Sequence, residues 1–158
     1  MGTTYVISVF LHVVFAAFWI GGILFIPLVL LPSIRTSTER VFLLHKTGIK
    51  FRFYGWIALT GLLITGIYNM LAKGLPFNWE FLTASSYGRL LGIKLLAFAV
   101  MLIISAIHDF YIGNKAIEQM QKNDNGKLKL IARWSGRINL LLALTIALLG
   151  VALSRGGF

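Results

Sequence analysis

The chain has 158 residues, of which 58% are hydrophobic, and its mean hydropathy is +0.82. This is the composition of a membrane protein rather than of a soluble domain. The absence of cysteine excludes disulfides, thiolate metal sites, iron–sulfur clusters and covalently attached c-type haem. The net charge of +10 comes from residues that flank apolar stretches, so lipid headgroups explain it better than nucleic acid does.

Four apolar stretches are each about long enough to cross a bilayer. We predict spans over residues 5–31, 53–71, 90–111 and 138–153, with an amphipathic cytoplasmic segment over 38–50. Short connections between spans are typical of an all-α, four-helix up-down bundle, which would make residues 1–158 one membrane domain. Most of the 15 Lys and Arg residues fall in the first and third loops, so these loops are predicted to be cytoplasmic and both termini outside.

Two histidines lie inside the predicted spans, His12 in the first and His108 towards the inner end of the third. An ionisable side chain at membrane depth is costly, so it usually faces the bundle interior, a partner or a cofactor. At the helical rise the depths of these two residues differ by roughly 15 Å. The sequence therefore predicts two separate polar clusters, with His12 and His108 as the candidate metal ligands, rather than one bis-histidine site.

The outer cluster is predicted to gather His12, Lys94, Arg89, Asn69 and Met70. Cationic Lys94 and Arg89 would suit carboxylates, such as haem propionates or an anionic substrate. The inner cluster is predicted to gather His45, His108, Asp109, Arg52, Trp134 and Asn139. The alternative is that each histidine is merely satisfied by a neighbouring helix, and that Lys94 extends outward to the interface.

Haem b needs one or two axial ligands, usually His with His or Met, and an apolar slot with cationic partners for its propionates. The candidates that could supply these groups are His12, His108, His45, Lys94, Arg89 and Met70. Membrane copper transport favours Cys and Met as ligands for Cu(I), but this chain has no cysteine and only four methionines, which are scattered. On residue chemistry alone, haem b for electron transfer or redox chemistry ranks ahead of copper transport or tolerance. A structural subunit without a cofactor also stays open.

Several segments resemble the membrane domain of CopD-type copper-resistance proteins. They are Leu11–Gly22, Arg52–Trp56, Thr65–Asn69, Ser86–Leu95 and His108–Phe110 with Gly113. The order and spacing of these segments agree with that family over most of the chain. The resemblance implies a bacterial inner-membrane protein linked to copper handling.

The first span is also similar to that of the HemJ family of protoporphyrinogen oxidases, in which a Leu-His…Trp motif carries a haem-linked histidine. Leu11, His12 and Trp19 match this motif, but the basic segment with Tyr-His that should follow the first span is missing. An oxidase activity of this kind is therefore a further alternative. The lipid bilayer is the one partner that the spans require, while other membrane subunits, a respiratory assembly and a homo-oligomer stay open.

Overall fold

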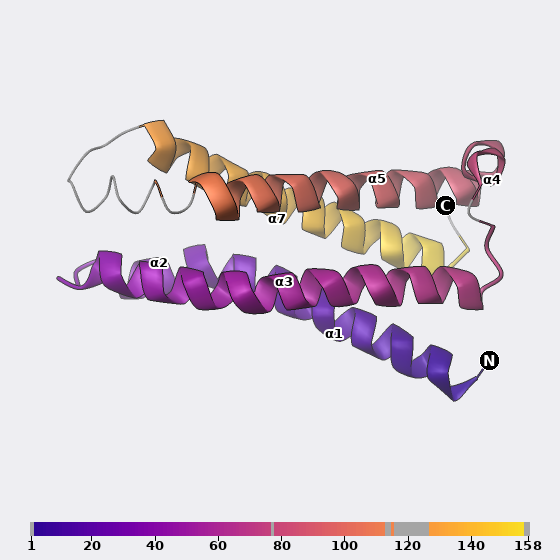
Figure 1. Ribbon diagram of the computed structural model, residues 1–158, viewed down its shortest axis with the longest axis horizontal. Coiled ribbons are helices and arrows are strands. Elements are labelled where there is room, and N and C mark those ends of the chain that lie inside the picture. The colour runs from indigo at the N-terminus through magenta and orange to yellow at the C-terminus, as the bar shows by residue number, and fades with distance from the viewer. Residues whose placement is uncertain (1, 77, 113–114, 116–126, 157–158) are drawn as a thin grey trace.

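The computed structural model describes residues 2–76, 78–112, 115 and 127–156. Four long helical segments make up most of this part of the chain: α1 (Thr3–Phe25) with η1 (Ile26–Leu30) and α2 (Leu31–Ser33), α3 (Arg40–Ala72), α5 (Ser86–Ile107) with η2 (His108–Ile112), and α7 (Lys127–Ser154). All four are long and apolar enough to cross a membrane. This confirms the predicted all-α fold with four spans, and both termini lie at the same end of the bundle (Figure 1). We call it the outer end, in keeping with the orientation that the loop charges predict.

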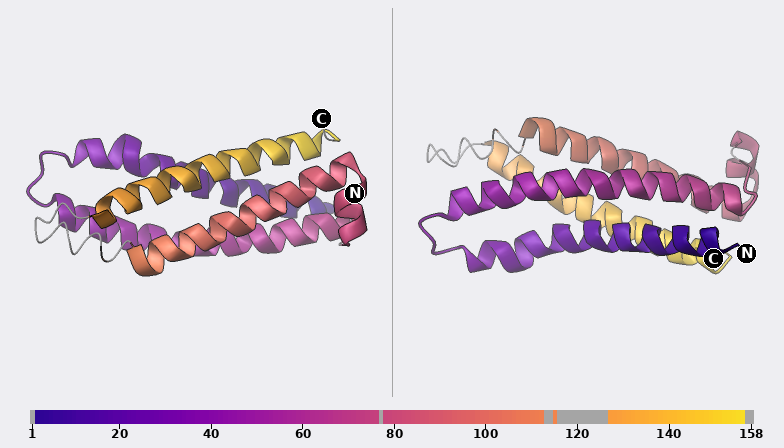
Figure 2. Two further views of the ribbon diagram at one scale, coloured as in Figure 1. Left: turned by 90° about the horizontal axis from the view of Figure 1, so that it is seen from above. Right: turned by 60° about the horizontal axis from the view of Figure 1, so that its bottom comes forward.

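The bundle consists of two antiparallel helix pairs. Helix α1 packs along α3 and helix α5 along α7, and contacts between α1 and α7 join the pairs (Figures 1 and 2). Helices α3 and α5 make few direct contacts. The short helix α4 (Trp79–Ala84) lies in the connection between α3 and α5 and packs against α5 at the outer end. The two pairs therefore leave one side of the bundle less tightly closed.

Glycines set the close contact between α1 and α3. The ring of Phe15 lies where a Cβ at Gly61 would stand, and the indole of Trp19 meets Gly55 in the same way. In the opposite direction, the Phe51 ring of α3 occupies the space beside Gly22 of α1. Small residues that admit a neighbouring helix are a usual packing device in membranes. These glycines hold side chains of this chain rather than space for a flat cofactor.

Helix α3 is longer than the predicted second span. The segment over 38–50, expected as a separate amphipathic stretch at the interface, forms the first turns of α3 from Arg40 onward. No proline interrupts the sequence from Arg40 to Ala72, so the helix continues into the membrane. It ends at Ala72, and Gly74, two residues later, has a φ of +66°, the left-handed conformation that glycine adopts easily.

Two short π-helical turns interrupt the long helices. The first, η1, contains Pro27, which has no N–H to donate to the preceding turn. The second, η2, begins at His108 and includes Asp109, two residues singled out by the sequence. Such turns are often found at functional sites, because an extra residue changes the direction of neighbouring side chains.

Candidate functional site: two histidine clusters in the bundle

The outer histidine lies where all four long helices approach one another. Nδ1 of His12, from α1, is 2.7 Å from Oγ1 of Thr65 on α3. Lys94 of α5 is close enough to His12 to interact with it electrostatically. The Lys94 ammonium in turn lies against Gly150 of α7, where a Cβ would be 3.3 Å from Nζ. The prediction that His12 and Lys94 share one polar cluster agrees with this geometry.

The partner of Thr65 decides which nitrogen of His12 carries a proton. The Thr65 hydroxyl donates to the backbone carbonyl of Gly61 at 2.6 Å. His12 also makes a hydrogen bond with the backbone at Leu62 of α3. If the Thr65 hydroxyl keeps its proton on Gly61, its oxygen accepts from His12, which makes Nδ1 the protonated nitrogen and leaves the lone pair on Nε2. Metal-binding histidines are usually held in this way, through a hydrogen bond from the nitrogen that does not bind the metal.

The inner histidine repeats this arrangement with different helices. Nδ1 of His108, in η2, is 2.7 Å from Oγ of Ser135 on α7. The Ser135 hydroxyl lies 3.0 Å from the carbonyl of Ala132, and if it donates there, the proton of His108 is on Nδ1 and the lone pair on Nε2. Two histidines at different depths thus make the same kind of contact, each with a hydroxyl that is bonded to its own helix.

Asp109 lies beside His108 but faces the other helix pair. Its carboxylate oxygen Oδ2 accepts from the indole N–H of Trp56 at 3.1 Å. Its backbone carbonyl accepts from Nη1 of Arg52 at 3.0 Å. Since successive side chains on a helix project about 100° apart, His108 reaches α7 while Asp109 reaches α3. The π-helical turn therefore ties the two helix pairs together at the inner end.

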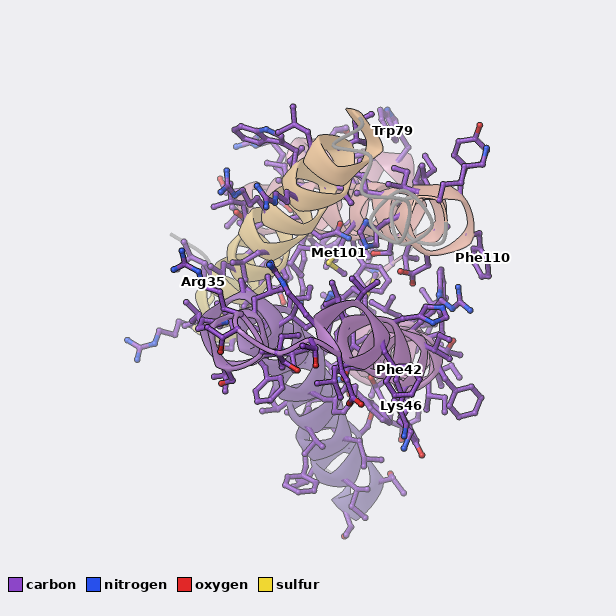
Figure 3. All side chains as sticks on the ribbon, turned by 90° about the vertical axis from the view of Figure 1, so that its left-hand side faces the viewer. Arg35, Phe42, Lys46, Trp79, Met101 and Phe110 are labelled. Carbon is purple, nitrogen blue, oxygen red and sulfur yellow. The ribbon has the colours of Figure 1, made fainter. Side chains whose placement is uncertain are left out.

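A chain of buried polar groups and one methionine lies between the two histidines. Met101 is only 2% exposed and packs against Trp19, Leu59 and Leu62. Figure 3 shows it near the centre of the bundle, whereas the labelled Arg35 and Lys46 point outward. One turn further inward, Ser105 donates to the carbonyl of Met101 at 2.7 Å. Ser105 also accepts from the amide of Asn139 at 3.0 Å.

Three other predicted site residues lie away from these clusters. Arg89 is exposed near the start of α5, where its guanidinium donates to the carbonyl of Thr83 and the hydroxyl of Ser86. Met70 is buried in an apolar cluster with Leu91 and Leu153. His45 is half-buried in the first turns of α3. The prediction that all three join His12 or His108 is not supported by these contacts.

The sequence did not single out the hydroxyls beside the histidines. Thr65 is only part of a segment that resembles the family and Ser135 lies in none, because a hydroxyl inside a helix normally donates to its own backbone and carries no distinctive signal. Spacing offers one clue: Ser135 lies one turn before Asn139, and Thr65 one turn before Asn69. Polar residues at a spacing of four share a helix face even within an apolar span.

A groove of about 710 Å³ opens on the side where the helix pairs are less tightly closed. It is lined by Phe15, Ile49, Arg52, Phe53, Trp56, Ile57, Thr60, Gly61, Ile64 and Phe110. None of these lining residues is a histidine or methionine that could serve as an axial haem ligand. Within the described ranges, no three His, Asp or Glu side chains come together as a metal-binding group.

The fold defines a multi-pass membrane protein with two histidines inside the bundle, each bonded to a hydroxyl of a neighbouring helix. The model of the copper resistance protein D (CopD) family matches residues 45–153 of this chain. The chain therefore belongs to the CopD family, as the resemblance of its motifs predicts. His12 precedes the matched range, so its part in the site rests on its own contacts.

One relative extends the likeness over almost the whole chain. An uncharacterised protein of Aquifex aeolicus (strain VF5) is 33% identical over 149 residues, which cover 93% of this chain and 93% of the relative. No solved structure matches the chain. The family links the protein to copper resistance and agrees with a place in the bacterial inner membrane.

The ranking of cofactors made from residue types has to be revised. The family favours copper, which the residue chemistry placed second, and neither the comparisons nor the contacts support haem b. The physical reason is space: the glycines on which a flat ring could lie already receive Phe15, Trp19 and Phe51. Haem and electron transfer are therefore no longer the preferred interpretation.

Proposed function

We propose that this protein binds copper ions within the membrane, at His12 near the outer end and at His108 near the inner end, and that it acts in copper tolerance or transport. The observation that carries the proposal is the repeated contact of the two histidines. Each imidazole has Nδ1 2.7 Å from a hydroxyl that is bonded to its own helix, an arrangement that would leave Nε2 as the nitrogen with a lone pair. Imidazole nitrogen is a good ligand for copper, and family membership supplies the choice of metal.

The order of groups along the bundle supports passage of an ion as well as its binding. Lys94, Met101 and His108 follow one another at intervals of seven residues on α5, which places them on one helix face. Met101 is a soft thioether donor between the two histidines. At the helical rise, the level of Lys94 and that of His108 are about 21 Å apart. Copper could thus meet ligands at three successive depths.

The test is metal binding by the purified full chain in detergent or nanodiscs. Wild-type protein loaded with copper is expected to retain two ions, and His12→Ala and His108→Ala one each. His45→Ala is the matched control, because His45 lies in the first turns of α3 outside both clusters. Retention of copper by the double variant His12→Ala/His108→Ala would refute the proposal. A Soret band in protein from haem-replete cells, lost in His12→Ala, would restore the haem interpretation.

Cellular copper content then tests the physiological direction. A strain that lacks the protein is expected to differ from the parent in total copper after exposure to the metal. Lower content would indicate import, and higher content would indicate export or sequestration. Complementation with His12→Ala or His108→Ala should fail, while His45→Ala should restore the parental value. Unchanged copper content and tolerance in the deletion strain would contradict a role in copper handling.

A further inference from the structure

The groove on α3 takes no part in the proposed copper sites. Its volume of about 710 Å³ lies within the range of about 300–1,000 Å³ that is usual for the binding of a small organic molecule. Eight of its ten lining residues come from α3, namely Ile49, Arg52, Phe53, Trp56, Ile57, Thr60, Gly61 and Ile64. Their intervals of three and four residues place them on one face of the helix. The groove therefore runs along the axis of α3.

Two phenylalanines from other elements form the sides of the groove. Phe15 of α1 fits against Gly61 on one side. On the other side, Phe110 of η2 packs on Trp56, with their ring centroids 5.8 Å apart. The Trp56 indole also donates to Oδ2 of Asp109 at 3.1 Å, which fixes this side of the groove. The helix face thus has two aromatic borders, one from each helix pair.

The length of the groove matches one leaflet of a bilayer. Arg52 and Ile64 are twelve residues apart on α3, which corresponds to about 18 Å along the helix axis. The hydrocarbon core of a membrane is about 30 Å thick, so one leaflet provides about 15 Å. Apart from Arg52 and Thr60, the residues that line the groove are apolar. One acyl chain can therefore lie along it with its headgroup at the level of Arg52.

Positive charge lies at the inner end of the groove. Nη1 of Arg52 donates to the backbone carbonyl of Asp109 at 3.0 Å, which positions the guanidinium, and the neutral carbonyl leaves its charge in place. Lys46 is exposed on the same helix face, one turn inward of Ile49. It lies about 9 Å from Arg52 along the helix axis, about one Debye length at physiological salt. The Asp109 carboxylate also interacts with Arg52, but the two cations outnumber it.

We infer that an anionic phospholipid binds in this groove, with an acyl chain along α3 and its phosphate at Arg52. A guanidinium can donate two parallel hydrogen bonds to a phosphate, and Lys46 adds attraction from one level further inward. Basic pockets between spans on the cytoplasmic side are typical sites for anionic headgroups. A neutral quinone, or a helix of a second copy, would use the apolar face but not the two cations.

The bound lipid would link the two helix pairs where they are less tightly closed. Its chain would contact α3 and the Phe110 ring of η2 at once. The inference goes beyond the proposed function and does not depend on it, because the groove contains neither His12 nor His108. Copper binding and lipid binding can therefore be tested separately.

The experiment is quenching of tryptophan fluorescence in the full chain by lipids with brominated acyl chains. Bromine quenches an indole only at close range, and Trp56 lines the groove. The protein is placed in phosphatidylcholine vesicles that contain a small fraction of brominated phosphatidylglycerol. The same fraction of brominated phosphatidylcholine is the matched probe. We expect the anionic lipid to quench at a lower mole fraction, and this difference to disappear in Trp56→Phe.

Two variants test the role of the cations. Arg52→Gln removes the charge but keeps an N–H donor, and should weaken binding of the brominated phosphatidylglycerol about fivefold. Lys46→Gln changes an exposed side chain, so it should fold normally even if Arg52→Gln does not, and should weaken binding by up to about fivefold. Arg133→Gln is the matched control, because Arg133 is an exposed cation of α7 outside the groove lining.

Three results would overturn the inference. Equal quenching of wild-type protein by both lipids would show that the groove takes up bulk lipid without selection. A preference for phosphatidylglycerol that persists in Arg52→Gln and Lys46→Gln would assign it to the basic loops as a whole. A Trp56 signal that neither lipid quenches, in a particle of twice the protein mass, would show that a second copy covers the groove. None of these results would alter copper retention at His12 or His108, so the proposed function would stand or fall by its own test.

Discussion

The two histidine clusters share one hydrogen-bond pattern but differ in the charge beside it. The neighbour of His12 is the ammonium of Lys94, whereas the neighbour of His108 is the carboxylate of Asp109. Asp109 is also bonded to Trp56 and Arg52 of the opposite helix pair. The inner cluster therefore combines a possible ligand with a structural link between helices. Among the described residues, the outer cluster has no such hydrogen bond between the helix pairs: His12 is bonded to Thr65 within the α1–α3 pair.

The largest effect is expected from removal of the hydroxyls that contact the histidines, those of Thr65 and Ser135. Each should change the copper affinity of its own cluster only. Thr65→Val is expected to lower the copper affinity of the outer site about 10–100-fold, the usual consequence of losing a second-shell partner, and to leave the inner site unchanged. Ser135→Ala should do the reverse. Chelator competition in the His108→Ala and His12→Ala backgrounds isolates each site. Equal affinities with and without the hydroxyls would show that the tautomers play no part in binding.

Asp109 should affect stability more than any residue of the outer cluster. Asp109→Ala removes the acceptor of the Trp56 indole, so we expect the free energy of unfolding to fall by about 1–3 kcal/mol. Asp109→Asn keeps an acceptor oxygen and should lose less. Ser8→Ala, on α1 at the outer end, removes an Oγ that has no hydrogen-bond partner among the described residues, so it is the matched variant and should lose nothing. Thermal unfolding in detergent measures the stability of the three variants. An Asp109→Ala protein as stable as wild type would contradict the structural role of Asp109.

The smallest effect is expected from Lys94, and it has the opposite sign. Lys94→Leu removes the positive charge beside His12 and should tighten copper binding at the outer site by about tenfold, comparable to the effect of a neighbouring charge on an ionisable group. The affinity at His108 should not change. Lys46→Leu, at an exposed lysine in the first turns of α3, is the control for loss of charge alone. Weaker outer-site binding in Lys94→Leu would mean that the lysine supports the ligand instead of opposing it.

The change in ranking from haem b to copper shows how far residue types can be used. Histidine, methionine and cationic side chains at membrane depth are the residue types that a haem site requires. Residue types alone do not show whether the helices leave a slot for the ring. Gly22, Gly55 and Gly61 have no side chain of their own, but each receives an aromatic ring of the neighbouring helix. A glycine in a span indicates that another group comes close to the helix, but not whether that group is a side chain or a cofactor.

The sequence by itself determined the class of protein, the four spans, the positions of His12 and His108 within them and the separation of the two into different clusters. These properties depend on hydropathy and helical spacing, which are local to the chain. Only the tertiary structure decided that His12 meets Thr65, that His108 meets Ser135, and that Arg89 and Met70 lie elsewhere. Those contacts depend on the rotation and relative height of each helix. Both are set where Phe15 and Trp19 fit against glycines of α3, through contacts between residues that are distant in sequence.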